Sequence, residues 1–528
     1  MTRTIELDGA SLTLDDLAAI AFERTPVAIA AAARHRVIAA RQVVDAVAER
    51  DTPSYGINTG FGNFADVKIP PHALDQLQVN LLRSHAAGVG DPLAIPVVRA
   101  TMALRANVLA KGYSGVRPAT LDLLVAMVNR GVHPVVPTRG SVGASGDLAP
   151  LAHLALVLIG EGDALEPSSA ASGVSRATDR LTIPGAETIP GAEALSRAGL
   201  APVRLGPKEG LALINGTQVS TAVLALTLHG ALRLARAADI AAALSIDGLQ
   251  GSTRPFEARI HAARGFAGQD AAAANLRMLL TGSPINAAHA NCGRVQDAYS
   301  MRCAPQVHGA AREAFDFAAR IVATEANAAT DNPMVFTAGD GEGEVVSGGN
   351  FHGAPVAIGA DVLCLGLAQL ATISERRADR LVNPALSGLP PFLTRDGGLQ
   401  SGLMIAQVTA AALTSELKSV AHPASVDSIP TSGNKEDHVS MSMTAAVKAA
   451  HALVLAQQVI AVEVLCACQA LDLLKPLTTS AALSRVHAAV RERVPTLDAD
   501  RSTSRDLAAI TELIATGAFE RACALKVN

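Results

Sequence analysis

The stretch "AAVKAAHALVLAQQVIAVEVLCACQALDLL", residues Ala445 to Leu474, decides the fold. It contains no proline and is long enough to form a helix of about 45 Å at 1.5 Å per residue. Apolar residues occupy most of its circumference, so neighbouring elements must bury it on nearly every side. Three other segments, 220–246, 309–329 and 353–381, are also long and apolar, and their only proline is Pro355, close to the start of the third. Together they predict a mostly α-helical protein built on a long central helical bundle.

A membrane bundle is the competing interpretation of such apolar helices. Charged residues interrupt the segments at spacings that a bilayer would penalise, namely Arg233, Arg236, Glu313, Arg320, Glu375 and Glu463. The opening "MTRTIELDGASLTLDD" also lacks the apolar stretch of a signal peptide. We therefore expect a soluble, cytoplasmic protein with no membrane partner, whose bundle continues into partner subunits.

Composition excludes several classes of function. The formal net charge is -4, which gives no basic surface for nucleic acid. Aromatic residues make up only 3% of the chain and tryptophan is absent, so the core must be filled by small and aliphatic side chains. The six cysteines are dispersed without a C-x-x-C pair, which predicts buried thiols rather than a zinc or redox site.

The first part of the chain differs from the rest in how often glycine and proline occur. Up to about Leu205, glycine and proline recur every ten to twenty residues or so, which predicts short helices joined by structured loops. We expect a smaller N-terminal region of mixed helices and loops over 1–205, and the long-helix bundle with C-terminal helices over 206–528. The unit TIPGAE occurs at Thr182 and again at Thr188, and 166–200 is predicted to be a surface insert. Residues 334–351 predict a small hairpin that caps the bundle.

The glycine-rich string "RGSVGASGDLAP", Arg139 to Pro150, admits four interpretations. It could be a plain turn that caps a helix, because serine and aspartate are good N-caps. A phosphate-binding loop usually ends in lysine, which is absent here. A serine hydrolase would use Ser145 as its nucleophile, although Gly146 follows directly where G-x-S-x-G is expected. In the fourth, the Gly146 nitrogen attacks the Ala144 carbonyl, and loss of two waters leaves an electrophilic methylidene-imidazolone ring (MIO).

Other strings favour the ring. They include "YGINTGFGNFADVKI" (from Tyr55), "QVNLLRSHAAGVGDP" (from Gln78), "LALINGTQVS" (from Leu211), "VQDAYSMRCAPQVHG" (from Val295), "SGGNFHG" and "HPASVDSIPTSGNKEDHVSM" (from His422). As a set they resemble the histidine and aromatic amino acid ammonia-lyase and aminomutase family, most closely its histidine branch, from about Leu12 onward. The resemblance implies an ammonia-lyase/fumarase-like fold and a ring formed from Ala144, Ser145 and Gly146 as the only prosthetic group, with no metal, pyridoxal phosphate or nucleotide. It also implies a homotetramer with active sites shared between subunits.

The same resemblance assigns the site residues. Tyr55 would remove the β-proton of an amino acid substrate, and its site would have to stabilise the phenolate. Arg302 would hold the substrate carboxylate, and Phe351 would pack beside the ring. Asn215, Gln296 and Tyr299 would position ring and substrate. Because Gln296, Tyr299 and Arg302 are three apart each time, we expect one helical turn to carry all three on one face.

Substrate choice depends on Ser84, His85 and Glu436. His85 and Glu436 could bracket a polar imidazole, with the carboxylate accepting its N–H, so the resemblance implies elimination of ammonia from L-histidine to give trans-urocanate. Lys435 stands where the histidine branch most often has glutamine, which leaves a phenylalanine or tyrosine ammonia-lyase or an aminomutase as alternatives. A serine hydrolase and a non-enzymic helical scaffold are the alternatives from other classes.

Overall fold

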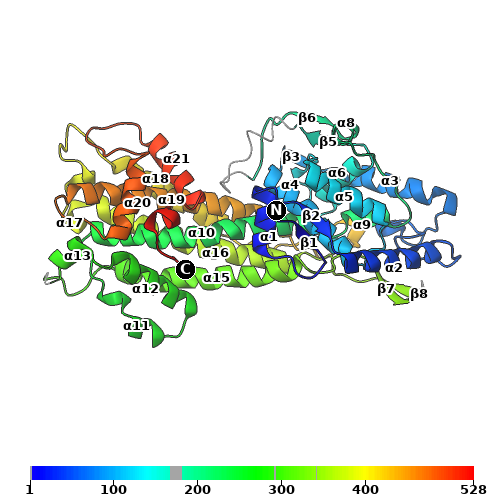
Figure 1. The fold of residues 1–528 in the computed structure, drawn as a ribbon, viewed down its shortest axis with the longest axis horizontal. Helices are drawn as coiled ribbons and strands as arrows, with labels where there is room; N and C mark the ends of the chain where they lie inside the picture. Colours follow the sequence, from blue (N-terminus) through cyan, green and yellow to red (C-terminus); the bar gives the residue numbers. More distant parts are fainter. Residues whose placement is uncertain (1–2, 167–180, 291–292, 340–341) are drawn as a thin grey trace.

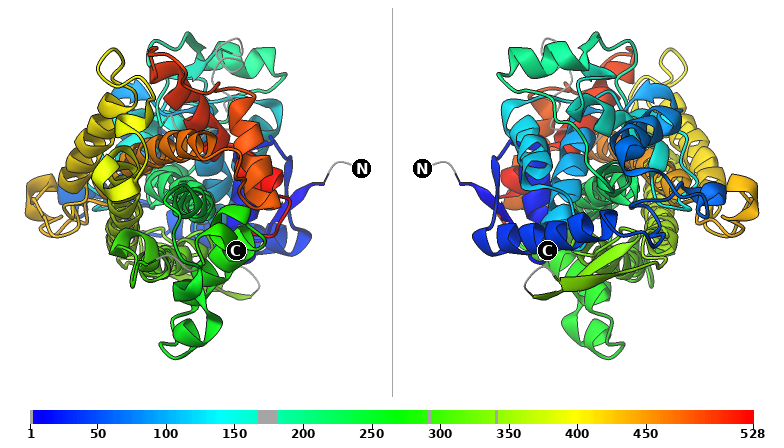
Figure 2. Two further views of the ribbon diagram at one scale, coloured as in Figure 1. Left: turned by 90° about the vertical axis from the view of Figure 1, so that its left-hand side faces the viewer. Right: turned by 90° about the vertical axis from the view of Figure 1, so that its right-hand side faces the viewer.

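The computed structural model describes residues 3–166, 181–290, 293–339 and 342–528 of the chain. Long helices run side by side along the molecule and form the expected bundle (Figure 1): α10 (Gln218–Gly248), α15 (Ala304–Glu325), α16 (Ala354–Val382), α18 (Met404–Val420) and α19 (Ser442–Leu473). Viewed along the length of the molecule, α10 lies in the middle of the other helices (Figure 2). The predicted α-helical fold is confirmed.

Small residues let the long helices approach one another closely. A Cβ added at Gly366 of α16 would lie 2.7 Å from the Phe315 ring of α15, and one at Gly248 of α10 would lie 3.1 Å from Ala470 of α19. Dispersion between such closely packed surfaces is individually weak but sums over the whole length of each helix. A core poor in aromatic residues is therefore filled by bringing the helix backbones together.

Two of the helices, α16 and α19, are long and apolar enough to cross a membrane by length and composition. Within their most apolar windows, 67% and 83% of the residues are buried inside the protein. Their charged residues Arg377 and Glu463 pair with each other, and both side chains are fully buried. These two helices therefore form the core of the bundle.

The N-terminal region lies at one end of the bundle (Figure 1). Its longer elements are α1 (Leu14–Phe22), α2 (Ala31–Ala48), α3 (Leu74–His85), α4 (Ile95–Ala110), α5 (Pro118–Arg130), α6 (Leu148–Leu158), α8 (Gly191–Arg197) and α9 (Glu209–Ile214). Strand β1 (Ile5–Leu7) pairs in parallel with β2 (Val27–Ile29), and β3 (Val89–Pro92) pairs antiparallel with β4 (Pro137–Arg139). One hydrophobic core continues from this region into the bundle, and the division at residue 205 stays a prediction.

Two local expectations are corrected by the structure. In the described part of 166–200, β6 (Thr188–Pro190) pairs with β5 (Asp163–Leu165), and Leu195 of α8 is fully buried. The second TIPGAE unit is thus strand and helix rather than loop, while 167–180 lie outside the described residues. Strands β7 (Met334–Gly339) and β8 (Glu342–Val346) do form the hairpin, but they pack on α2, because Val335 is buried in a cluster with the valines of that helix.

Shorter helices complete the chain. They are α11 (Ala258–Ala262), α12 (Ala267–Leu280), α13 (Pro284–Ala288), α14 (Tyr299–Arg302), α17 (Pro384–Ser387), α20 (Ala481–Arg491), α21 (Ser504–Ala515) and α22 (Ala518–Cys523). Four of the described cysteines are buried as expected, whereas Cys303 is only half-buried, and Cys292 lies outside the described residues.

Candidate active site

The loop before α6 is packed against the segment that leads into α10. Gly146 forms a parallel bridge with Gly216, and the Asp147 amide donates a 2.7 Å hydrogen bond to the Gly216 carbonyl. Gly146 has φ +72°, and a Cβ there would lie 2.2 Å from the Gly216 oxygen. Only glycine fits at this position. The backbone of the Ala144–Ser145–Gly146 loop is therefore held in close contact with Gly216.

The carbonyl and the hydroxyl of Ser145 have partners from distant parts of the chain. The Asn215 side-chain amide donates to the Ser145 carbonyl at 3.2 Å, and the Ser145 hydroxyl donates to Oε1 of Glu436 at 2.7 Å. Oε2 of Glu436 accepts from Thr431 at 2.6 Å and from Ser432 at 2.8 Å. Burial alone would raise the pKa of Glu436, but these three hydroxyl donors hold it below its ordinary value. An ionised carboxylate thus lies directly on the Ser145 side chain.

The Asp147 side chain connects the Ser145 loop to the start of α10. Its fully buried carboxylate accepts hydrogen bonds from the Ser220 amide at 2.8 Å, the Ser220 hydroxyl at 2.9 Å and the Ser141 hydroxyl at 2.9 Å. Burial raises the pKa of Asp147 in spite of these donors. The first turn of α10 and the Ser145 loop are thereby joined by one side chain.

Tyr55 and Glu436 lie on loops that contact each other, through the short 3-10 helices η1 (Gly62–Phe64) and η5 (Ser432–Asn434). Burial raises the pKa of Tyr55; the Gly62 amide opposes this, and the negative charge of Glu436 adds to it. The expectation that the surroundings of Tyr55 stabilise its phenolate is wrong for a single chain. Any such stabilisation must come from a charge that this chain does not bring to the loop.

His85 is the last residue of α3. Its Nδ1 is 2.9 Å from the Leu81 carbonyl, which can only accept, so Nδ1 carries the hydrogen and Nε2 is the acceptor of the neutral ring. Burial lowers the pKa of His85, in agreement with that neutral form. The neighbouring Ser84 is exposed and donates to the same carbonyl at 3.1 Å, so its hydroxyl is engaged within its own helix.

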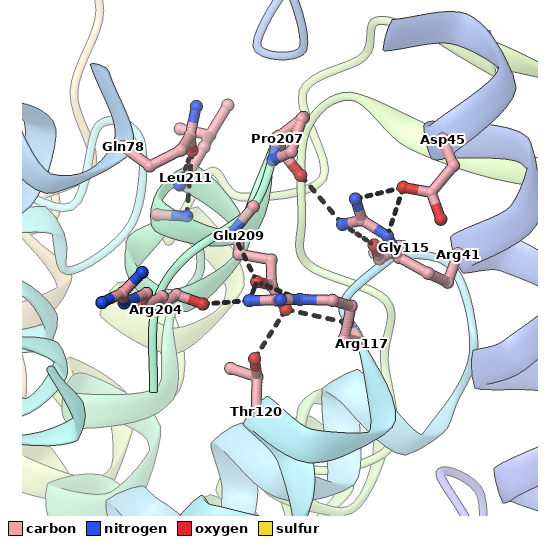
Figure 3. A network of polar contacts seen from close by, with 12 residues as sticks. Arg41, Asp45, Gln78, Gly115, Arg117, Thr120, Arg204, Pro207, Glu209 and Leu211 are labelled. Carbon is pink, nitrogen blue, oxygen red and sulfur yellow. Dashed lines mark hydrogen bonds and ion pairs between the residues drawn. The ribbon is translucent and has the colours of Figure 1, made fainter. Parts of the chain in front are cut away.

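Buried polar contacts hold α3 against α9 (Figure 3). Helix α3 ends at His85, and Asn215 directly follows α9. Oε1 of Gln78 on α3 accepts the Gly210 amide of α9 at 2.9 Å. The Glu209 carboxylate, fully buried, accepts from Nε of Arg117 at 2.9 Å and from Thr120 at 2.6 Å. Nη1 of Arg105, also buried, donates to the Asn215 carbonyl at 2.8 Å. Sequence reasoning missed these residues, because a lone charge or amide in a helix gives no sign that it is buried.

The remaining predicted residues lie at the opposite end of the bundle. Tyr299 and Arg302 form the single turn α14, where Met301 packs against Gly251, just beyond the end of α10. Asn215 stands just before the start of α10, and the 31 residues of that helix span about 45 Å. The Tyr299 side chain is 71% exposed, and Cζ of Arg302 lies 4.6 Å from the centre of its ring.

The structure therefore divides the predicted site into two groups. Gln296 is exposed in the loop before α14, so the expectation of one helical turn carrying all three residues is wrong; only Tyr299 and Arg302 share the turn. Phe351 belongs to the first group, because it lies two residues before Gly353, whose amide donates to the Gly143 carbonyl at 3.2 Å. That group comprises Tyr55, Ser84, His85, Ala144, Ser145, Gly146, Asn215, Phe351 and Glu436.

Within the described parts of the chain, no group of three or more His, Cys, Asp or Glu side chains is placed to hold a metal ion. The expectation that the site works without a metal stays a prediction.

Comparison with known proteins assigns the family. The sequence profile of the aromatic amino acid lyases matches residues 12–492. The chain belongs to the aromatic amino acid lyase family. Membership confirms the resemblance seen in the glycine-rich strings, and it makes the protein a carbon–nitrogen lyase.

The sequence of this lyase is similar to those of known relatives over nearly its full length. It is 57% identical to a histidine ammonia-lyase of Anaeromyxobacter sp. (strain K), with 98% of this chain and 99% of the relative covered. Among solved structures, it is similar to the histidine ammonia-lyase of Trypanosoma cruzi, with a TM-score of 0.88, 43% identity and coverage of 99% and 95% of the two chains. The tyrosine aminomutase of Streptomyces globisporus has a TM-score of 0.91 at 36% identity, with 100% of both chains covered.

Proposed function

We propose that the protein eliminates ammonia from L-histidine to give trans-urocanate, using an electrophilic ring formed from Ala144, Ser145 and Gly146. The observation that carries the proposal is the ionised Glu436 carboxylate, 2.7 Å from the Ser145 hydroxyl and close enough to His85 to affect its pKa. The histidine ammonia-lyases with 49–57% identity to this chain support the choice of substrate.

The residues around Ser145 fit such a ring. Its formation removes the Ala144 carbonyl oxygen and the Ser145 hydroxyl as two waters, together with the Ser145 and Gly146 amide hydrogens and the Ser145 Cα hydrogen. It retains the Ser145 carbonyl as the ring oxygen. Gly146 has no side chain to obstruct closure, and Asn215 already donates to the carbonyl that is retained. A donor fixed at that oxygen stabilises negative charge as it develops there. Once formed, the ring supplies the electrophile that activates the substrate amine for departure.

Glu436 changes partner when the ring forms. Loss of the Ser145 hydroxyl removes the donor to Oε1, while Thr431 and Ser432 still hold Oε2. The released oxygen can accept the imidazole N–H of histidine. A phenyl ring would leave Oε1 of this carboxylate without a donor, at a cost of order 1–3 kcal/mol or more. This difference favours histidine over phenylalanine.

Tyr55 serves as the base in this proposal, and Arg302 binds the substrate carboxylate through two parallel hydrogen bonds. One chain cannot bring them together, because about 45 Å of helix separates the two groups. A site that contains both therefore takes Arg302 and Tyr299 from another copy of the chain. A cation brought in this way would also lower the pKa of Tyr55, which burial raises in the single chain.

Exposed apolar side chains on the bundle support association of several copies. Ile358 and Leu365 of α16 are 47% and 48% exposed, and Ile405 and Val408 of α18 are 64% and 51% exposed. Large exposed apolar patches mark interaction surfaces. A homotetramer, as the family resemblance implies, is part of the same proposal, and so is its location in the cytoplasm.

The test is ultraviolet absorbance at the urocanate band during incubation with L-histidine, L-phenylalanine or L-tyrosine. We expect a rise with L-histidine only, and none with the Ser145→Ala variant. Intact mass should show a deficit of two waters, about 36 Da, in the wild type but not in that variant. A signal with L-tyrosine or L-phenylalanine would refute the roles of His85 and Glu436, and a β-amino acid product would identify an aminomutase.

A serine hydrolase is less well supported by the geometry. The Ser145 hydroxyl donates to a carboxylate rather than to a histidine, which a serine nucleophile ordinarily needs as its base. Labelling of Ser145 by a fluorophosphonate, with no mass deficit, would reverse this conclusion.

A further inference from the structure

A set of charged side chains is buried in the bundle beneath α14, far from Ser145. We call it the Arg377 network: Asp239 of α10, His308 of α15, Arg377 of α16 and Glu463 of α19. The side chains of its four members are fully buried. Ser245 of α10 is a buried neighbour of the network. The mechanism proposed above uses none of them.

Arg377 is the centre of this network. Its Nε and Nη2 donate to the two oxygens of Glu463, the latter at 2.9 Å, in a two-pronged ion pair. Oε1 of Glu463 also accepts from Ser245 at 2.7 Å. The remaining nitrogen, Nη1, points out of the pair and donates to the Ser300 carbonyl at 3.3 Å. Ser300 lies within α14, between Tyr299 and Arg302.

His308 fixes the direction of Nη1. Its Nδ1 is 2.6 Å from Oδ1 of Asp239, and because a carboxylate only accepts, this nitrogen carries the hydrogen. Nε2 is then the acceptor, and it lies 3.5 Å from Nη1 of Arg377. Burial lowers the pKa of His308, which keeps the ring in this neutral form despite the adjacent Asp239. The hydrogen bonds thus run in one direction, from Arg377 to His308 to Asp239.

Stability alone does not account for this arrangement. Burying an ion pair costs so much desolvation that apolar side chains of similar volume are often as stable or more so. Such a network does fix a geometry, because each member has one set of partners and one orientation. The turn it reaches carries Arg302, whose Nε is buried without a partner in this chain, so the direction of the guanidinium depends on the turn itself.

We propose that the Arg377 network positions α14 so that Arg302 meets the carboxylate of the substrate. The inference rests on the proposed function. Arg377 and His308 are positioning residues here: they act on a site to which α14 is contributed by one copy of the chain and Ser145 by another.

The test compares Arg377→Lys with Ser245→Ala. Lysine retains the positive charge opposite Glu463, but its single ammonium group cannot also donate a hydrogen bond to the Ser300 carbonyl. Ser245→Ala is the matched control, because it removes a buried hydrogen bond to the same carboxylate without contacting α14. We expect Arg377→Lys to raise the KM for L-histidine about tenfold or more, with a smaller change in kcat, and Ser245→Ala to leave both near wild type. Inhibition by urocanate, which has a carboxylate, should weaken similarly, whereas inhibition by imidazole should not.

The remaining measurements separate positioning from folding. Arg377→Lys should keep the two-water mass deficit and the assembly, because Arg377 is fully buried within the bundle of its own chain and contacts neither the Ala144–Ser145–Gly146 loop of that chain nor its exposed surface. Loss of either, or a KM no higher than that of Ser245→Ala, would overturn the proposal. If Arg377→Lys does not fold, His308→Asn decides: its amide can still donate to Asp239 but no longer reaches Arg377, and it too should raise KM.

Hydrogen exchange tests, without any substrate, whether the network holds α14 in place. Peptides covering 299–303 should exchange faster in Arg377→Lys than in the wild type, and unchanged exchange would count against the network. If the wild type fails to turn over L-histidine, the proposed function is wrong, but the hydrogen-exchange comparison still shows whether the network holds α14.

Discussion

Mixing two inactive variants should restore activity if the site is shared between subunits. Ser145→Ala removes the ring-forming hydroxyl but leaves Arg302, and Arg302→Ala removes the guanidinium but leaves Ser145. The 31 residues of α10 form a rod of about 45 Å between the two groups, so neither variant can repair itself within one chain. In a mixed assembly, a Ser145→Ala subunit can supply Arg302 to a neighbour that retains Ser145.

The size of the recovery follows from the geometry. Ser145→Ala should be almost inactive, and Arg302→Ala should lose about 100-fold or more in kcat/KM, since each hydrogen bond to a charged group is worth about 1.5–3 kcal/mol. With equal and random incorporation, a site receives both intact groups in about one quarter of cases, because each of its two contributing subunits must be of the right type. Hybrids should therefore recover about a quarter of wild-type activity.

The assay uses co-expression with two different affinity tags and successive purification on both, so that only mixed assemblies are measured for urocanate formation. In the control, a single variant is co-expressed as two copies, each with a different tag, and is purified in the same way. Hybrids of confirmed composition that are no more active than the better parent would refute a shared site. Full turnover by a well-folded monomer would refute it as well.

Further variants test the structure near Ser145 and away from it. Asn215→Ala removes the donor to the Ser145 carbonyl and should lower kcat about 100- to 1000-fold, measured by steady-state kinetics on protein whose mass deficit is intact. Gly216→Ala should prevent the loop from packing, because its φ is +143° and a Cβ would lie 2.7 Å from Nη1 of Arg105; loss of the mass deficit and a lower Tm would show this. Asp472→Asn should destabilise the fold by about 3 kcal/mol at neutral pH. Burial would raise the pKa of Asp472, but its close contacts with His487 and Lys475 and the charge of Arg491 hold it far below its ordinary value. A depressed pKa stabilises the fold above the unfolded pKa, near 4, and the effect is lost as pH falls, so the Tm difference between this variant and the wild type should shrink in acid.

Much of the fold could be predicted, because the long helices can be recognised from their own stretches of sequence. Continuous apolar character predicts α16 and α19 to within a few residues of their observed bounds, and the one proline in them, Pro355, lies in the first turn of α16. Helix α15 begins at Ala304 rather than near Gly309, because Pro305 is tolerated in the first turn of a helix. The helical state of a segment depends mainly on its own residues, so it can be inferred without the partners that bury it.

Placement of these elements was less predictable. The hairpin packs on α2, and the second TIPGAE unit pairs with β5, because strands of a few residues are stabilised by whatever surface they meet. Likewise Gln78, Arg105, Glu209 and Arg377 are buried, although isolated charges and amides on helices usually face solvent.

The sequence by itself determined the family to which the chain belongs, and it predicted the chemistry of the Ala144–Ser145–Gly146 loop. Ring closure needs a small residue, a hydroxyl and a glycine in direct succession, and that requirement can be met within three adjacent positions. Only the tertiary structure decided which of the other residues accompany this loop. It places Glu436 and Asn215 on Ser145, and it puts Tyr299 and Arg302 at the far end of the bundle. Distances between segments far apart in the chain are set by the length and packing of rigid helices, and no local pattern of residues records them.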